Sequence, residues 1–263
     1  AMNALNKLKS PYLVKMLSAA AAPTPALSLE LCSKHNLRDL LEYGRTVGAS
    51  DRLGLVVDVA RGLTAMHGAG WVHLDLKEHN IMISNKVDPA AGANDSEGSM
   101  STPHRETPRL LAKLGDFGSA KYLPKPAPLD EIAAQNVHGT AGWTAPELLS
   151  ALEGEKVCVS KSADMFSFAI IMWRSLIIDV GIPQELGHSN GAVVVPHNPL
   201  QSLAGKDAAE KIVGCNGVPP LRPYWPEDSP DPRVHDVSIL LGKLWHSDPA
   251  ARPTAQETIA DLE

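Results

Sequence analysis

One polar stretch of the sequence combines a carboxylate, an amine and an amide at close spacing. It reads His73-Leu-Asp-Leu-Lys-Glu-His-Asn80 and is flanked by apolar residues. A carboxylate such as Asp75 can accept the proton of a hydroxyl group, and the amide oxygen of Asn80 can bind a hard cation. Lys77 lies between them and can neutralise charge on a phosphoryl group in transfer. The residue types and their spacing therefore fit phosphoryl-transfer chemistry.

Further motifs follow in a fixed order along the chain. They are Leu114-Gly-Asp-Phe-Gly118, Gly139-Thr-Ala-Gly-Trp-Thr-Ala-Pro-Glu147, Asp164 before an apolar run, and Asp248-Pro-Ala-Ala-Arg-Pro253. In this order and rough spacing they resemble the eukaryotic protein kinases, with particular similarity to the tyrosine-kinase-like group of serine/threonine kinases. The resemblance extends over residues 1–263.

The resemblance implies a role for each polar residue of the motifs. Asp75 would be the catalytic base, and Lys77 would contact both the γ-phosphate and the acceptor hydroxyl. Asn80 and Asp116 would hold Mg²⁺ against the phosphates of ATP. ATP and Mg²⁺ are therefore the expected cofactors.

The resemblance also implies an adenine site near the N-terminus. Leu29 would be the gatekeeper, the backbone of Glu30 and Cys32 would hydrogen-bond adenine, and Met82 would lie beneath the ring. Lys77 together with Thr140 fits a short Ser or Thr acceptor on a protein substrate, because the lysine and the hydroxyl would form the floor that seats it.

Three supporting arrangements are expected on the same grounds. Glu147 would form an ion pair with Arg252, and Asp164 would brace the backbone of the catalytic loop. A packed column linking two lobes would contain Leu5, His73 and Phe117.

Hydrophobic patterning indicates the elements that must position these residues. Residues 51–67 have an amphipathic helical period, and residues 164–173 are apolar on every side, which is typical of a central helix. Short apolar runs at 71–73, 81–83 and 110–114 predict strands around the motifs, and Thr254 with Glu257 predicts a capping box that opens the last helix. Residues 86–109 are rich in small and polar types and predict a disordered surface insert.

The N-terminal part has a different character. A helix is expected to end before Ser10–Pro11, a strand to start near Leu13, and a second strand to cover residues 26–32. Asn36 is expected to cap a short helix that ends at Gly44. The predicted fold is α+β and protein-kinase-like: residues 1–32 form a remnant of a β-rich N-lobe, with the end of helix C, two strands and the hinge, and residues 33–263 form the helical C-lobe.

Several family features are missing from the sequence. It contains neither a glycine-rich loop before residue 26 nor a Val-Ala-Ile-Lys strand, and Ala1 stands where the glutamate of helix C is expected. This predicts either a fragment of a longer protein or a truncated, kinase-derived module. Leu74 replaces the arginine that pairs with an activation-segment phosphate, and residues 120–138 contain Tyr122 but no Ser or Thr. We therefore expect the order of this segment not to depend on Ser/Thr phosphorylation.

Composition and charge indicate which partners and which cellular compartment to expect. A formal net charge of −6 does not favour nucleic acid or an anionic membrane surface as a partner, and no apolar run is long enough to predict a membrane span. The odd number of cysteines, without a Cys-x-x-Cys unit, predicts free thiols in a reducing, cytoplasmic compartment.

The alternatives to a serine/threonine protein kinase are a non-catalytic pseudokinase or scaffold, and a small-molecule phosphotransferase of similar fold. The absent N-terminal strands favour the scaffold, whereas the combined presence of Asp75, Lys77, Asn80 and Asp116 favours catalysis. The small-molecule enzyme is the least favoured, because it would not need the 140–147 platform for a peptide.

Overall fold

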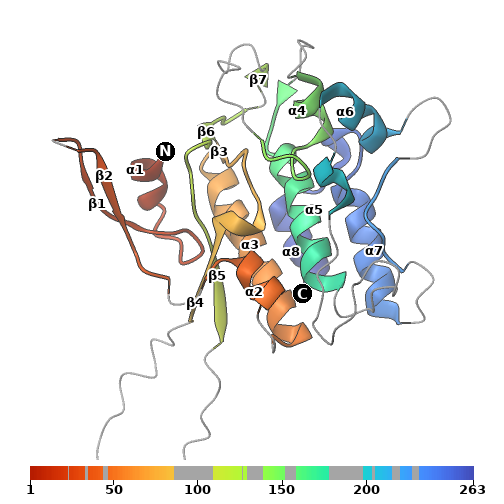
Figure 1. The fold of residues 1–263 in the computed structure, drawn as a ribbon, viewed down its shortest axis with the longest axis horizontal. Coiled ribbons are helices and arrows are strands. Elements are labelled where there is room, and N and C mark those ends of the chain that lie inside the picture. Colours follow the sequence, from red (N-terminus) through yellow and green to blue (C-terminus); the bar gives the residue numbers. More distant parts are fainter. Residues whose placement is uncertain are drawn as a thin grey trace, which may run out of the picture.

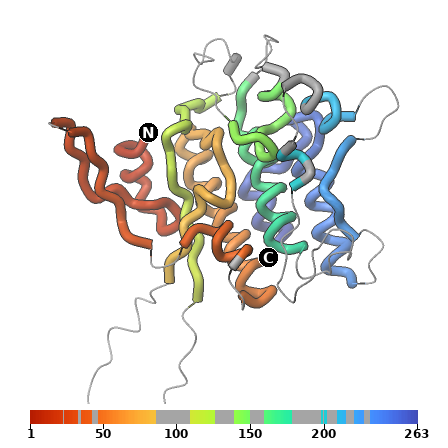
Figure 2. The backbone as a smooth tube through the Cα atoms, viewed as in Figure 1, coloured from red at the N-terminus to blue at the C-terminus, as the bar shows by residue number. Residues whose placement is uncertain are grey.

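The computed structural model describes residues 1–22, 24–32, 35–43, 47–85, 109–125, 127–128, 139–151, 158–177, 198–202, 205–214, 220–226 and 231–263. Most of the predicted insert at 86–109 therefore lies outside the described residues, as does the predicted helix end at Gly44. In Figures 1 and 2 the N-terminal elements lie to one side and the long helices stack on the other.

The N-terminal side is formed by α1 (Met2–Asn6), β1 (Met16–Ala20) and β2 (Ala26–Leu29). The two strands pair antiparallel as a separate two-stranded sheet. Both strand predictions were wrong in their bounds. Leu13 makes only an isolated bridge with Leu114 before β1 begins at Met16, and β2 ends at Leu29 rather than at residue 32.

The apolar side chains of Leu17 in β1, Leu27 in β2 and Leu31, two residues after β2, are not covered by the described residues. Leu17 is 59 % exposed, Leu27 61 % and Leu31 93 %. A two-stranded sheet with a solvent-facing apolar surface is marginally stable by itself, so this unit depends on neighbouring structure for its order.

The helical side begins with α2 (Leu37–Tyr43) and α3 (Ala49–Gly68). The predicted cap of α2 is confirmed, because the side chain of Asn36 accepts a hydrogen bond from the Asp39 N–H at 2.9 Å. Helix α3 packs against strand β5 (Leu110–Leu114) and against helices α5 (Ser162–Leu176) and α8 (Ala255–Leu262). Its Gly62 permits this close approach, since a Cβ atom there would lie 2.9 Å from Cγ of Leu114.

Helix α5 occupies the centre of this side, as its sequence predicts. Every residue from Ala163 to Leu176 is buried, so the helix contributes apolar surface in all directions. It packs against α7 (Pro232–Leu244) and the 3₁₀ helix η6 (Pro249–Ala251), while α4 (Pro146–Ala151) packs against α6 (Gly205–Val213), which the 3₁₀ helix η5 (Pro199–Ser202) precedes. The predicted capping box of α8 is confirmed, with Thr254 and Glu257 bonding reciprocally.

Short strands hold the loops that carry the motifs. Strand β3 (Trp71–Val72) pairs with β6 (Lys121–Tyr122), β4 (Ile81–Asn85) pairs with β5, and β7 (Ala127–Pro128) pairs with β8 (Cys158–Val159), all antiparallel. The polar stretch 73–80, which ends in the 3₁₀ helix η1 (Glu78–Asn80), runs between β3 and β4. The β4–β5 pairing brings it beside the Asp116 turn, because Ile81 lies opposite Leu114.

Candidate active site

A buried carboxylate organises the backbone of the 73–80 loop. Asp164, at the start of α5, accepts hydrogen bonds from the N–H groups of His73 at 2.8 Å and Leu74 at 2.9 Å. His67 at the end of α3 donates a third bond from Nε2 at 2.8 Å. These bonds hold Leu74 at a positive φ of 66°, which an L residue rarely adopts. The predicted brace by Asp164 is confirmed.

Burial would raise the pKa of the Asp164 carboxyl, but the hydrogen bond and charge of His67, together with His73, lower it below its usual range. Because the folded-state pKa lies below the unfolded value, the ionised carboxylate stabilises the fold above about pH 4 and loses that effect as pH falls through the depressed pKa.

We therefore expect Asp164→Asn to lower the free energy of unfolding by about 3 kcal/mol at pH 7, since the amide leaves buried donors unpaired. The difference from the wild type should start to shrink below about pH 4, where the carboxyl of the unfolded wild-type chain takes up a proton, and should be lost as pH falls through the depressed pKa of the folded protein. Urea denaturation of both proteins at several pH values measures this. A difference that stays constant with pH would contradict the assigned role of the ionised carboxylate.

Asp75, Lys77 and Thr140 form a closed set of contacts at the surface of the loop. Lys77 Nζ donates to Asp75 Oδ2 and to Thr140 Oγ1, each at 2.8 Å. Thr140 Oγ1 in turn donates to Asp75 Oδ1 at 2.6 Å. A residue of the 139–147 segment thus lies directly against the loop, although more than sixty residues separate them in sequence.

Asn80 connects this group to the Asp116 turn. Its Nδ2 donates to the backbone oxygen of Asp75 at 2.8 Å and to Asp75 Oδ2 at 3.2 Å. Its backbone oxygen accepts from Gly115 N at 2.8 Å, and His73 Nε2 donates to the Gly115 oxygen at 3.0 Å. The ring centroids of His73 and buried Phe117 lie 5.7 Å apart, so these two members of the predicted packed column are in contact.

The oxygen atoms that could hold a metal ion are those of Asn80 and Asp116. The two donated bonds commit the Asn80 nitrogen to Asp75, which leaves its amide oxygen for another ligand. Asp116 is exposed, has a positive φ of 51° and accepts a bond from Gly118 N at 3.3 Å. Hard oxygen donors of this kind suit Mg²⁺, which keeps waters and phosphate oxygens as its other ligands.

The residues expected to hold adenine are Met82, which lies in β4, and three residues at or just after the end of β2. The Glu30 carboxylate accepts from Lys15 N at 2.7 Å and forms an ion pair with Lys113 of β5 at 2.8 Å. Lys113 lies opposite Met82 in the β4–β5 register. Leu29 is partly exposed and Cys32 half-buried, and burial raises the pKa of the Cys32 thiol, with a smaller contribution from the charge of Glu30. Cys32 is a free thiol, as predicted; the side chain of Cys158 and all of Cys215 lie outside the described residues.

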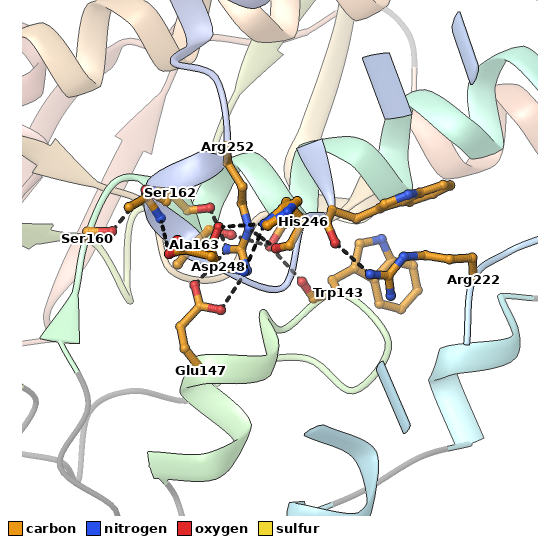
Figure 3. A network of polar contacts seen from close by, with 12 residues as sticks. Trp143, Glu147, Ser160, Ser162, Ala163, Arg222, His246, Asp248 and Arg252 are labelled. Atoms are coloured by element: carbon orange, nitrogen blue, oxygen red, sulfur yellow. Dashed lines mark hydrogen bonds and ion pairs between the residues drawn. The ribbon is translucent and has the colours of Figure 1, made fainter. Parts of the chain in front are cut away.

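The predicted ion pair between Glu147 and Arg252 is confirmed and is bidentate. The two guanidinium nitrogens lie 2.7 and 2.8 Å from the two carboxylate oxygens. Arg252 also donates to the backbone oxygens of His246 at 2.8 Å and Ser162 at 3.0 Å, and its side chain is fully buried. Figure 3 shows it between Glu147 and the backbone at His246, so α4, α5 and the segment before α8 meet at one side chain.

Two partners of these groups were not predicted from the sequence. His67 bonds Asp164, and Lys113 bonds Glu30. The burial of His67 could have been predicted, because it stands next to Met66 in the apolar stripe of α3. No sequence pattern predicted the contact of Lys113, since its partner Glu30 lies eighty-three residues away.

Comparison with known proteins agrees with this arrangement. The family description "Protein kinase domain" matches residues 2–261. The relatives include mitogen-activated protein kinase kinase kinase 13-A of Xenopus laevis, 24 % identical over 98 % of this chain and 21 % of the relative. Mitogen-activated protein kinase kinase kinase 12 of Rattus norvegicus is 24 % identical over 98 % of this chain and 23 % of its own length. The probable serine/threonine-protein kinase drkD of Dictyostelium discoideum is 25 % identical over 98 % of this chain and 16 % of its own length.

The chain thus spans about a fifth of the length of the first of these relatives. None of the helices within the described ranges combines the length and apolar character needed to cross a membrane. The family match covers nearly the whole sequence and agrees with the α+β architecture and the predicted contacts at Asp164 and Arg252. This chain therefore belongs to the protein kinase domain family.

Proposed function

We propose that the chain is the catalytic part of a serine/threonine protein kinase that transfers the γ-phosphate of ATP to Ser or Thr hydroxyls of a protein substrate. The observation that carries the proposal is the closed set of contacts among Asp75, Lys77 and Thr140. It places a proton acceptor, a cation and a hydroxyl group together at an accessible surface. The names of the relatives, two mitogen-activated protein kinase kinase kinases and a probable serine/threonine-protein kinase, support the same activity.

Asp75 acts as the proton acceptor in this proposal. In the structure its Oδ1 accepts a short bond from the Thr140 hydroxyl. The hydroxyl of a bound Ser or Thr substrate can donate to the same carboxylate and lose its proton to it as its oxygen bonds the γ-phosphorus of ATP, while the bond from that phosphorus to the bridging oxygen breaks and ADP leaves. Lys77, bonded to the other carboxylate oxygen, orients Asp75 and places a positive charge beside the transferred group.

Asn80 and Asp116 are the proposed magnesium ligands, because the amide oxygen of Asn80 and the exposed carboxylate of Asp116 are the kind of oxygen donors that Mg²⁺ prefers. A magnesium ion bound there would neutralise charge on the phosphates of ATP. Asn80 also fixes the position of Asp75 through its Nδ2 bonds. We assign the adenine contacts to Leu29, to the backbone of Glu30 and Cys32, and to the side chain of Met82.

Transfer to protein hydroxyls is tested with the full-length protein, radiolabelled ATP, Mg²⁺ and a mixture of peptides that contain Ser, Thr or Tyr. We expect label on phosphoserine and phosphothreonine. Label on phosphotyrosine alone would overturn the assigned acceptor, and label on small molecules but on no peptide would favour the small-molecule phosphotransferase.

We propose that the order of the activation segment does not depend on Ser/Thr phosphorylation within it. Tyr122 carries the only hydroxyl among residues 120–138, and its exposed ring packs against Trp71, with the ring centroids 5.6 Å apart. We therefore expect Tyr122→Phe, which keeps this ring contact, to leave kcat within about twofold of the wild type, because an exposed substitution of this kind changes energies by about 0.5 kcal/mol or less. Steady-state kinetics of the full-length protein checks this, and abolished activity would show that phosphorylation or the hydroxyl itself is required.

The division into an N-lobe remnant at 1–32 and a C-lobe at 33–263 is part of the proposal, as is a cytoplasmic location. A partner-binding scaffold without catalysis is the second candidate, favoured by the exposed apolar side chains of Leu17, Leu27 and Leu31. The two functions are distinguished by the peptide assay, since a scaffold transfers no label.

A further inference from the structure

A buried ionic cluster lies behind the catalytic loop and is used by none of the steps above. We call it the Glu78 cluster, and its members are Arg38 and Glu42 of α2, Glu78 and His79 of η1, Trp143, and Arg174 of α5. Glu78 has no exposed surface and the Arg174 side chain is 7 % exposed. Charged side chains are rarely buried this deeply unless they have a specific partner.

The contacts of the Glu78 cluster link separate elements of the fold. Arg174 Nε lies 3.4 Å from Glu78 Oε1, and Arg174 Nη2 lies 3.7 Å from Glu42 Oε1. The guanidinium carbon of Arg174 lies 5.8 Å from the ring centre of Trp143, within the range of a cation–π contact. One arginine therefore contacts both the catalytic loop and the segment that carries Thr140.

Arg38, the second arginine of the Glu78 cluster, holds Glu42 and His79 in place. Arg38 donates to Glu42 Oε1 at 2.8 Å and to His79 Nε2 at 2.7 Å. Since His79 accepts this bond through Nε2, that nitrogen carries no proton. Burial lowers the pKa of His79, and the charge of Arg38 lowers it further. With His79 neutral, the charged groups of the Glu78 cluster are two arginines that face two carboxyl groups.

Hydrogen bonding in the Glu78 cluster is incomplete. Within the described residues, most of the buried side-chain nitrogen and oxygen atoms that lack a well-aligned hydrogen bond belong to it: both carboxylate oxygens of Glu78, Nδ1 of His79, Nε1 of Trp143 and Nε of Arg174. Burial raises the pKa of Glu78, and the charge of Arg174, a backbone hydrogen bond and a long side-chain hydrogen bond from Trp143 oppose that rise. Apolar residues of similar volume commonly give equal or greater stability than such a buried pair, so stability alone does not account for these residue types.

We propose that Glu78 and Arg174 are positioning residues that set the peptide-binding segment against the catalytic loop. Glu78 is the direct neighbour of Lys77 in the chain, and Trp143 N bonds the backbone oxygen of Thr140 at 3.0 Å. The pair thus acts on the buried side of the same two segments that Lys77 and Thr140 join at the surface. It determines the distance between Asp75 and a hydroxyl held on residues 140–143. This inference rests on the proposed kinase function and names residues that adjust its peptide site.

A double-mutant cycle in the full-length protein tests the proposal. Its variants are Glu78→Gln, Arg174→Gln and the two combined; Asp261→Asn and Lys243→Gln, from an exposed ion pair of α8 and α7, are the matched controls. We expect each single variant to raise KM for peptide about tenfold, a size typical of coupling between contacting residues, with KM for ATP changed less than about twofold. The combined variant should resemble the single variants, because the second substitution removes a contact that is already lost. Independent multiplication of the two effects, or an unchanged KM for peptide, would overturn the proposal.

Hydrogen exchange supplies a readout that does not need catalysis. In either single variant the amides of residues 139–149 should exchange about tenfold faster, while those of α3 keep the wild-type rate and the control variants match the wild type throughout. Unchanged exchange in 139–149, or an equal acceleration in α3, would show that the pair does not position this segment. If the wild-type protein phosphorylates no peptide, the proposed function fails, and the exchange pattern alone decides whether Glu78 and Arg174 position the segment.

Discussion

Asp75→Asn is expected to lower kcat for peptide phosphorylation by about 10²- to 10⁴-fold, the usual contribution of a positioned general base. Asparagine has nearly the same shape but cannot take the hydroxyl proton. Its amide nitrogen would also face a donor, since each oxygen of Asp75 accepts a bond, from Lys77 on one side and Thr140 on the other. KM for ATP should change little, because Asp75 is not among the proposed nucleotide contacts.

The measurement compares steady-state rates of the wild-type and Asp75→Asn full-length proteins at saturating ATP and Mg²⁺. Asp261→Asn makes the same chemical change at an exposed pair and should keep the wild-type rate. Thermal unfolding of each protein controls for loss of structure. An Asp75→Asn protein that stays folded and retains kcat within about threefold would exclude Asp75 as the general base.

Loss of Arg252 is expected to destabilise the protein strongly. Arg252→Met should lower the free energy of unfolding by about 3–5 kcal/mol, as removal of one partner of a buried ion pair typically does. The substitution leaves the Glu147 carboxylate without its two bonds and also frees the backbone oxygens of Ser162 and His246. Phe166 loses the guanidinium group, whose central carbon lies 5.2 Å from its ring centre.

Urea denaturation measures this loss, and Lys243→Met is its matched control. Lys243 pairs with Asp261 at 3.3 Å, with both side chains about half exposed, so its removal should cost less than about 1 kcal/mol. A second comparison combines Arg252→Met with Glu147→Leu, which removes the uncompensated charge and should recover part of the stability. If Arg252→Met costs no more than the control, the buried ion pair does not hold the three segments together.

Contacts that rest on recurring motifs could be predicted from the sequence. Glu147 and Arg252 are more than one hundred residues apart, yet each lies in a motif whose order along the chain indicates its partner. The same applies to Asp164 and the backbone of the catalytic loop. Helices α3 and α5 were predictable for a different reason: α3 has a long amphipathic period, and α5 is apolar on every side, which is typical of a central helix.

Contacts between residues outside the motifs could not be predicted. Arg174 stands within an apolar helix and Glu78 within a polar loop, and neither context indicates that they meet ninety-six positions apart. The ion pair of Glu30 and Lys113 could not be predicted for the same reason, because neither residue lies in a motif that indicates its partner. The β1 strand was placed too early because Leu13 and Val14 are apolar; they are buried against the rest of the fold, and Val14 N bonds the backbone oxygen of Leu114 instead of a β2 residue.

The proposed phosphate transfer requires Asp75, Asn80 and Asp116 to act together on ATP and a peptide hydroxyl. Asp116→Asn tests this directly, because the carboxylate is exposed and its only described bond, from Gly118 N, can also be made to an amide oxygen. The rate of phosphate transfer from ATP to a Ser/Thr peptide should be compared between this variant and the wild-type full-length protein at saturating Mg²⁺. We expect a rate at least about 10²-fold lower, as for loss of a principal electrostatic group in phosphoryl transfer; equal rates would contradict the proposed catalytic site.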